Sequence, residues 1–331
     1  MIDPISKGID DFGNSLLQAL NSVQGIFGKE LSVANPVKDN VLQLIGNTPL
    51  IKLNRIGSEH EGIHFYLKAE FLNPTGSAKD RTALAIYLDA ERRGKLKKGM
   101  TVVLCGAGSS SVSFSWIGKF KEYPVLCFVP IQTPPDKIQV LRSYGAEVVV
   151  TNESDPTRLQ ELAEEKSKKI NGWVPEESLN PAGPNFHFKT TGPEIWRDLG
   201  NKVGAVISAP GTGAAITGIG RYLKSQDSKI LVAIAGKKTS PLIRYASASG
   251  KIEKETIDLP SVYDPKLIDF HFTATEEEAL HLQADLYEKE GIFVGLTTGI
   301  VMIGALRLAE LVKRDDRREP FNIVVLSPDR V

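Results

Sequence analysis

From residue 41 onward, short runs of apolar residues alternate with longer stretches in which apolar residues recur every three or four positions. The short runs predict strands at 50–53, 63–69, 101–105, 124–130, 147–151, 205–208, 230–234 and 322–326. The longer stretches predict helices at 82–93, 112–121, 135–144, 157–170, 216–225, 276–290 and 298–314. Continuous Val, Ile and Leu strands separated by helices are typical of parallel sheets covered on both faces. The pattern therefore predicts an α/β fold.

The first 38 residues form a separate segment with a pattern of its own. Apolar residues recur there in helical steps, at Ile9, Phe12, Leu16, Leu20, Val23 and Phe27. This spacing predicts an amphipathic helix, which we expect to pack on the rest of the chain or on a second subunit. A helix lying on a membrane surface is the less favoured alternative, because the polar face lacks Lys and Arg.

Composition narrows the class of protein. A chain of 331 residues predicts about two domains. The 40 basic and 40 acidic residues cancel, which argues against nucleic-acid or membrane partners. The two cysteines and the scattered histidines show no metal spacing, so we expect no metal site. The two cysteines also form no disulfide framework, which favours a reducing compartment. Without an apolar run of about 18 residues or a signal-peptide pattern, we expect a cytoplasmic protein.

Two Gly-rich segments, at 106–111 and 210–215, follow predicted strands and lead directly into predicted helices. Parallel sheets bind ligands at the carboxyl ends of their strands, where free N–H groups at a helix start can hold a phosphate or carboxylate. One such turn alone is weak evidence for a site that binds a phosphate or carboxylate. No G-x-G-x-x-G with a downstream acidic partner follows a strand, which disfavours the alternative of a nicotinamide cofactor.

Lys79 lies between turn-forming residues and an uninterrupted helical pattern. An ammonium at a helix start faces the positive end of the helix dipole, which favours the neutral amine that imine formation with an aldehyde requires. A solvated lysine at an ordinary helix start would give the same local pattern. Lys79 together with the two Gly-rich segments favours a phosphorylated cofactor.

Longer motifs point to a family. The segment Asn73-Pro74-Thr75-Gly76-Ser77-Ala78-Lys79-Asp80-Arg81 resembles the Schiff-base lysine motif of the cysteine synthase (O-acetylserine sulfhydrylase) and cystathionine β-synthase family. The stretch 44–50, LIGNTPL, resembles the opening signature of that family. Further landmarks follow in the family's order at 141–147, 190–196, 211–213, 217–218 and 295–299. The resemblance runs from about residue 39 to 329.

The resemblance implies an architecture. Family members are fold-type II pyridoxal-phosphate enzymes, similar to the tryptophan synthase β chain, with parallel-rich sheets flanked by helices in two domains. The implied smaller domain is 73–183, the larger one is 39–72 plus 184–331, and the cofactor cleft lies between them. A homodimer is also implied.

The resemblance further implies β-replacement on an O-activated serine such as O-acetylserine. The β-substituent leaves to give an aminoacrylate, and sulfide or a thiol adds to give cysteine or a related amino acid. Lys79 would anchor pyridoxal 5'-phosphate and remove the α-proton, while the cofactor acts as electron sink. Haem is not implied, because no cysteine precedes Cys105.

Several aligned positions differ from the family. The family's substrate-carboxylate loop, Thr-Ser-Gly-Asn-Thr-Gly, aligns with Gly106, Ala107, Gly108, Ser109, Ser110 and Ser111. The first two positions lose hydroxyls that bind the substrate carboxylate. The amide that contacts the cofactor's 3′-oxygen is replaced by Ser109, a shorter donor.

The phosphate loop, Gly-Thr-Gly-Gly-Thr in the family, is Gly211, Thr212, Gly213, Ala214 and Ala215 in this chain. The hydroxyl lost here is worth about 1.5–3 kcal/mol as a bond to a charged group. Ala214 adds a Cβ where glycine tolerates unusual backbone conformations.

Two further differences place charges in the expected site. Glu176 aligns with the family's carboxylate-binding glutamine, and a shift of one residue would place Glu177 there instead. Either carboxylate would repel the carboxylate of an amino acid. Arg330 aligns with a serine that meets the pyridine nitrogen. Arginine only donates hydrogen bonds, so it would leave that nitrogen unprotonated and weaken the electron sink.

Two hypotheses about function remain open. One is an active β-replacement enzyme with a changed choice of substrate. The other is a catalytically weakened paralogue, a possible pseudoenzyme, that acts as a binding or regulatory partner. By analogy alone, such a paralogue could receive the peptide tail of a partner protein in its cleft.

Overall fold

The structure is a computed structural model that describes residues 37–248, 257–312 and 320–330. The chain divides into two units, Met1–Asp39 and Asn40–Val331. The amphipathic helix predicted for the first 38 residues lies outside the described residues. The second unit contains two sheets, which are described in turn.

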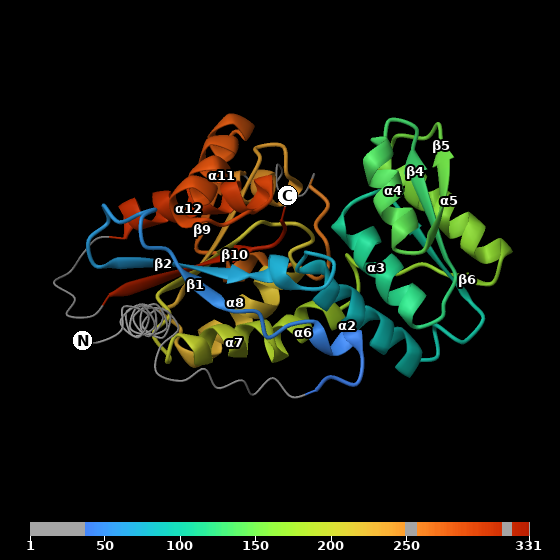
Figure 1. The fold of residues 1–331 in the computed structure, drawn as a ribbon, viewed down its shortest axis with the longest axis horizontal. Coiled ribbons are helices and arrows are strands. Elements are labelled where there is room, and N and C mark those ends of the chain that lie inside the picture. The colour runs from blue at the N-terminus through green and yellow to red at the C-terminus, as the bar shows by residue number, and fades with distance from the viewer. Residues whose placement is uncertain (1–36, 249–256, 313–319, 331) are drawn as a thin grey trace, which may run out of the picture. The chain divides into compact units, whose positions relative to one another are not determined.

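The larger sheet has six strands in the order β1-β2-β10-β7-β8-β9 (Figure 1). They are β1 (Leu50–Lys52), β2 (Ile63–Ala69), β10 (Phe321–Ser327), β7 (Ala205–Ser208), β8 (Leu231–Gly236) and β9 (Phe270–Thr273). Only β1 runs antiparallel to its neighbour β2. The last strand of the chain, β10, pairs with β2 from Phe321 opposite Ile63 to Ser327 opposite Ala69.

Helices cover both faces of this sheet, and the side chains of β10 alternate between them. Ile323 and Val325 pack in a core with α11 (Glu276–Glu290) and α12 (Leu296–Leu311). Val324 and Leu326 pack in a second core with α7 and α8. The helices on this second side are α6 (Ala182–Lys189), α7 (Thr191–Asp198), α8 (Ala214–Gln226) and α9 (Pro241–Ser247). Burial on both faces explains the continuous apolar pattern of the strands.

The smaller sheet has four parallel strands in the order β5-β4-β3-β6. Its strands are β3 (Thr101–Cys105), β4 (Val125–Pro130), β5 (Ala146–Thr151) and β6 (Gly172–Trp173). The accompanying helices are α2 (Lys79–Arg92), α3 (Ser109–Phe120), α4 (Pro135–Ser143) and α5 (Pro156–Lys169). Tyr87 of α2 and Phe114 of α3 pack in its core, with ring centroids 5.5 Å apart. Three short 3₁₀ turns complete the described elements, η1 (Val41–Leu44), η2 (Glu70–Leu72) and η3 (Pro265–Leu267).

The predicted α/β fold with parallel-rich sheets is confirmed, and each of the eight predicted strands forms. The sequence missed the edge strands β6 and β9, and the short helices α6, α7 and α9. β6 has only two residues, and β9 is at most half-buried along its length. The division into two domains stays a prediction, since Asn40–Val331 forms one compact unit. Among the described residues, no helix is both long and apolar enough to cross a membrane.

Candidate active site

Lys79 is the first residue of α2, three residues earlier than the helical pattern predicted. The preceding segment turns at Gly76, whose φ is +79°, a value that glycine adopts without strain. It is tied to the end of β10 by an N–H of Ala78 that donates to the carbonyl of Pro328 at 2.9 Å, and by a bridge between Ser77 and Asp329. Long-range backbone contacts therefore hold the start of α2 in place.

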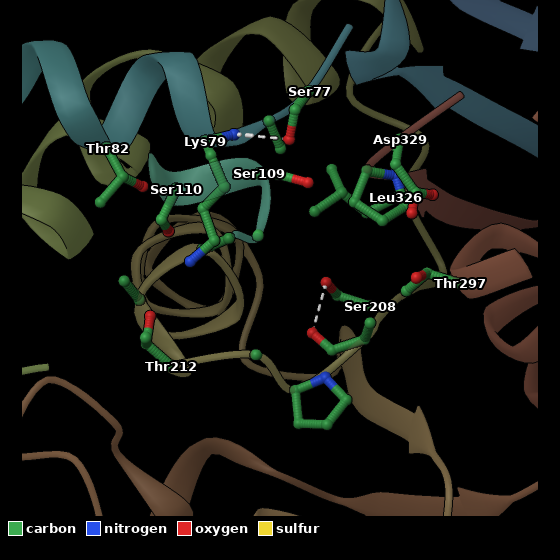
Figure 2. A pocket seen from close by; sticks show the side chains of 18 of the residues that line it. Ser77, Lys79, Thr82, Ser109, Ser110, Ser208, Thr212, Thr297, Leu326 and Asp329 are labelled. Carbon is green, nitrogen blue, oxygen red and sulfur yellow. Dashed lines mark hydrogen bonds between the residues drawn. The ribbon is translucent and has the colours of Figure 1, made fainter. Parts of the chain in front are cut away.

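Lys79 lines a cleft of about 390 Å³, which is within the range of small-molecule sites (Figure 2). The cleft walls come from the starts of α2, α3, α8 and α12 and from the ends of β7 and β10. The lining includes Ser77, Lys79, Thr82, Gly108, Ser109, Ser110, His187, Ser208, Pro210, Gly211, Thr212, Gly213, Ala214, Ala215, Thr297, Leu326 and Asp329.

Four helix starts at this cleft lack a side-chain cap. The N-cap residues of α2, α3, α8 and α12 supply no side-chain hydrogen bond to the first turn, although in α2 the hydroxyl of Ser77 accepts one from the N–H of Lys79 at 3.2 Å. Uncapped N–H groups and the positive ends of the helix dipoles favour an anion. The cleft is therefore suited to a negatively charged ligand.

The loop before α8 has the geometry of a phosphate cradle. Gly211 and Gly213 have φ of +48° and +83°, and Gly213 is the N-cap of α8. Both positions are in the left-handed region that glycine tolerates. Ala214 is the first helical residue and does not have a positive φ, so the strain anticipated from its Cβ is not present.

The amine of Lys79 is paired with a carboxylate. Its Nζ donates to Oε1 of Glu177, and the hydroxyl of Ser110 donates to the other oxygen, Oε2, at 2.5 Å. The two charged side chains are 28% and 14% exposed. Glu176 and Glu177 both line an adjoining cavity of about 460 Å³. Of the two acidic residues considered from the sequence, Glu177 is the one in contact with Lys79.

The structure brings together most but not all of the predicted site residues. Lys79, Gly108, Ser109, Ser110 and the loop from Gly211 to Ala215 line the cleft. Gly106 and Ala107 line a neighbouring opening instead. Arg330 is exposed and does not line the cleft; its side chain packs near Gly76, where a Cβ would lie 3.3 Å from Nε.

The ionisable residues Asp329 and His187 are among the cleft residues that were not predicted. Asp329 lines the cleft beside Thr297, and burial raises the pKa of its carboxyl. His187 is fully buried, with Thr191 Oγ1 2.9 Å from Nδ1 and Thr82 Oγ1 3.2 Å from Nε2. Burial lowers the pKa of His187 to about 3, so its imidazole is neutral.

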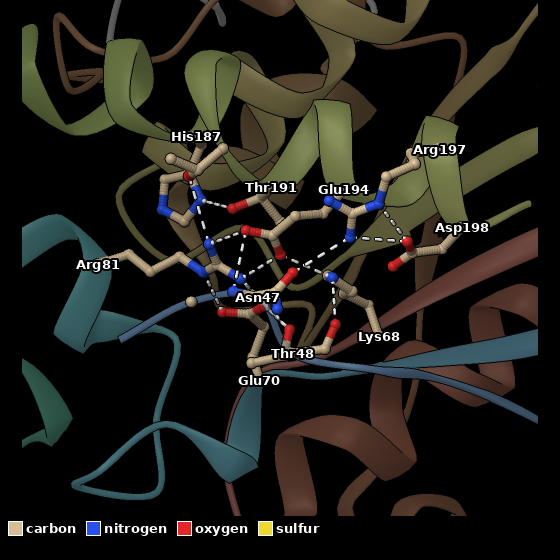
Figure 3. A network of polar contacts seen from close by, with 12 residues as sticks. Asn47, Thr48, Lys68, Glu70, Arg81, His187, Thr191, Glu194, Arg197 and Asp198 are labelled. Carbon is tan, nitrogen blue, oxygen red and sulfur yellow. Dashed lines mark hydrogen bonds and ion pairs between the residues drawn. The ribbon is translucent and has the colours of Figure 1, made fainter. Parts of the chain in front are cut away.

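A buried network of charges surrounds Arg81 of α2 (Figure 3). Arg81 forms ion pairs of 2.7 Å with Glu70 and with Glu194, and Lys68 approaches Glu194 at 2.8 Å. None of these four side chains is more than 9% exposed. Burial alone raises the pKa of Glu194, but Arg81 and Lys68 outweigh it and hold the pKa at about 2. A lysine within the apolar run of β2 was the sequence signal for this network.

Comparison with known proteins gives the family. Residues 41–329 match the family model described as pyridoxal-phosphate dependent enzyme. The chain is 34% identical over 269 residues to cysteine synthase B of Escherichia coli strain K12, covering 81% of this chain and 87% of that protein. It is 30% identical over 308 residues to cystathionine β-synthase of Apis mellifera, covering 89% and 60%. The structure of O-ureido-L-serine synthase superposes with a TM-score of 0.79 at 28% identity, covering 89% and 92%.

Proposed function

We propose that this chain, which belongs to the family of pyridoxal-phosphate-dependent enzymes, catalyses β-replacement on an O-activated serine. The substrate would be of the O-acetylserine type, the nucleophile sulfide or a thiol, and the product cysteine or a related amino acid. The observation that carries this proposal is the position of Lys79 in a cleft formed by four uncapped helix starts. Cysteine synthase and O-ureido-L-serine synthase are both names of enzymes that form amino acids substituted at the β-carbon.

The cleft residues fit pyridoxal phosphate. The N–H groups of Ala214 and Ala215 and the hydroxyl of Thr212 would hold its phosphate, since the start of α8 has no side-chain cap. The amine of Lys79 would hold its aldehyde carbon, and Ser109 would offer one hydroxyl to the ring substituents. When bound, the cofactor supplies the electron sink for cleavage of the Cα–H bond.

Lys79 would serve as the base in the reaction. Its Nζ would take the α-proton of the substrate, and Glu177 would keep the resulting ammonium within the cleft by accepting its hydrogen bond. Glu177 also orients the hydroxyl of Ser110, a predicted ligand of the substrate carboxylate. A substrate carboxylate at Ser110 would therefore meet the charge of Glu177, which weakens its binding.

The cofactor assignment is tested by trapping. The protein is purified with pyridoxal phosphate, reduced with borohydride and digested, and the peptides are mapped by mass spectrometry. We expect one pyridoxyl group, on Lys79, and none in Lys79→Ala. A reduced cofactor on another lysine would refute the role of Lys79, and no label at all would refute cofactor binding in this cleft.

Turnover is tested separately on the same preparation. O-acetylserine and sulfide are added, and free cysteine is measured over time; homocysteine in place of sulfide tests the other thiol acceptors. We expect cysteine from the unaltered protein and none from Lys79→Ala. A protein labelled on Lys79 that makes no product would support the alternative hypothesis of a weakened paralogue.

Assembly and location remain predictions of the sequence. We infer a homodimer in the cytoplasm, and sizing by light scattering tests the first of these. A peptide-tail partner belongs only to the alternative hypothesis. Under that hypothesis, the cofactor would still be trapped on Lys79, but the cleft would bind the peptide and would not turn over substrate.

A further inference from the structure

Asp329 is the only acidic residue among the described residues that line the cleft, and the proposed reaction has so far given it no role. Its backbone position is fixed from two sides. Ser77 forms a bridge with it, and the N–H of Gly295 donates to its carbonyl at 3.1 Å. Asp329 and Lys79 come from different walls of the cleft (Figure 2).

The carboxylate of Asp329 is half-buried and has no cationic partner among the described residues. Thr298 Oγ1 lies 3.4 Å from Oδ1, and Thr297 also contributes a hydroxyl. The carboxylate packs so closely on Gly295 that a Cβ there would lie 2.6–2.7 Å from its atoms. Hydrogen bonds from Thr297 and Thr298, including the backbone N–H of Thr298, offset part of the cost of its desolvation, but no positive charge of the described chain does. A half-buried acid of this kind is further stabilised when a ligand supplies a cation or a strong donor.

Neighbouring residues at the end of β10 are not available for the same contact. The hydroxyl of Ser327 is fully buried and lies 2.8 Å from Thr298 Oγ1. Arg330, which the sequence placed at the ring nitrogen, is exposed and packs near Gly76. Of the last residues of the described chain, Asp329 alone presents a charged group to the cleft.

Pyridoxal phosphate has four polar features, and three of them are matched by the groups assigned above: the phosphate by the start of α8, the aldehyde by Lys79 and the 3′-oxygen by Ser109. The fourth is the basic ring nitrogen, for which an aspartate is a common partner in enzymes that use this cofactor. We propose that Asp329 accepts a hydrogen bond from the protonated ring nitrogen of pyridoxal phosphate. The nitrogen takes its proton from water, and Asp329 remains a carboxylate. This inference rests on the proposed function, because it requires pyridoxal phosphate in this cleft.

The consequence is a stronger electron sink. A protonated ring nitrogen withdraws electrons from the substrate carbon more effectively than a neutral one. The arginine expected from the sequence would have had the opposite effect, since it only donates hydrogen bonds. Asp329 thus compensates within the fold for the absence of the family's hydroxyl at this position.

The direct test is the protonation state of the bound cofactor. Pyridoxal phosphate isotopically labelled at the ring nitrogen is bound to the full chain, and its nitrogen NMR shift is recorded with the pyridoxyl trapping as a parallel check. We expect a protonated nitrogen in the unaltered protein and in the neighbouring control Arg330→Ser, and a neutral nitrogen in Asp329→Asn. A neutral nitrogen in the unaltered protein with Lys79 labelled would overturn this inference but leave the proposed function intact. Absence of any cofactor would overturn both.

A second measurement does not depend on how Asp329→Asn folds. The affinity of the unaltered protein for pyridoxal phosphate is compared with that for an analogue in which carbon replaces the ring nitrogen. We expect the analogue to bind at least about tenfold more weakly, as for loss of a hydrogen bond to a charged group. Equal affinities in the unaltered protein would contradict the role of Asp329.

Discussion

Lys79 and Arg81 are two residues apart on α2 but belong to opposite kinds of environment. Lys79 faces a cleft in which it has one carboxylate partner and four helix starts lack side-chain caps. Arg81 is fully buried, and its guanidinium is shared between Glu70 and Glu194. The charges of the network are satisfied by the protein itself, whereas the cleft has helix starts whose N-cap residues supply no side-chain acceptor, so N–H groups there are available to a ligand. The first turn of α2 thus contributes one residue to a buried charge network and another to the cleft.

Because of this difference, we expect the charge network to contribute to stability and the cleft to ligand binding. A satisfied buried network fixes the backbone around it, because removing one partner leaves a charge without compensation. An uncapped helix start costs about 1 kcal/mol relative to a capped one, and a bound anion can supply the missing contacts. Substitutions in the network should therefore reduce stability, and substitutions in the cleft should change ligand binding with little effect on folding.

The largest expected effect is on stability. Arg81→Met leaves Glu70 and Glu194 without their main partner, so the free energy of unfolding should fall by about 3–5 kcal/mol. Arg92→Met is the matched control on the same helix, because Arg92 is 73% exposed and its pair with Asp89 should contribute less than about 1 kcal/mol. Urea unfolding measures both. Equal losses in the two variants would refute the distinction between buried and exposed pairs.

The neutral imidazole of His187 makes stability depend on pH. Its pKa is about 3 in the folded protein and about 6.5 when unfolded, so the unfolded state binds the extra proton between these values. Stability should therefore fall as the pH drops below 6.5, by up to about 1.4 kcal/mol per unit from this group. His187→Gln should flatten the slope between pH 6.5 and 4.5, and the exposed His281→Gln should not. Below pH 4.5 the carboxylates of the network, including Glu194, add their own loss.

Substrate affinity tests the charge of the cleft. Glu177→Gln removes the carboxylate beside Lys79 and Ser110, so O-acetylserine should bind the holoenzyme at least about tenfold more tightly. Glu176→Gln removes the same charge one residue away, from a side chain that lines the same adjoining cavity but is not the partner of Lys79 and Ser110, and should leave the affinity unchanged. Titration of the cofactor absorbance measures both. The same gain in both variants would indicate a long-range charge effect instead of a contact at Ser110.

The smallest expected effect concerns the phosphate loop. Ala215→Thr returns a hydroxyl to the first turn of α8, which should tighten binding of pyridoxal phosphate about 2- to 10-fold. Ala107→Thr is the control, because Ala107 lines a neighbouring opening and not the cleft. Dissociation constants from fluorescence titration distinguish them. No gain from Ala215→Thr would mean that the backbone N–H groups already satisfy the phosphate.

The positions of helix starts illustrate what a pattern of apolar residues leaves out. The pattern predicted helices from 82, 112 and 216, but α2, α3 and α8 begin at Lys79, Ser109 and Ala214. The residues of each first turn line the cleft, so they do not share the apolar periodicity of the turns that pack in a core. Those first turns are the parts of the helices that form the candidate site.

Local sequence determined the strands, the parallel α/β fold, the Gly-rich turns and Lys79 at a helix start, because each depends on neighbouring residues and their backbone preferences. Tertiary structure alone decided which of two adjacent residues takes part in the candidate site. Glu177 and not Glu176 contacts Lys79, and Asp329 and not Arg330 lines the cleft, where the bridge to Ser77 and the close packing on Gly295 fix its position. The charge network likewise joins β2, α2 and α7 from distant parts of the sequence. Contacts of this kind are set by how elements pack, a property that no local pattern of residues contains.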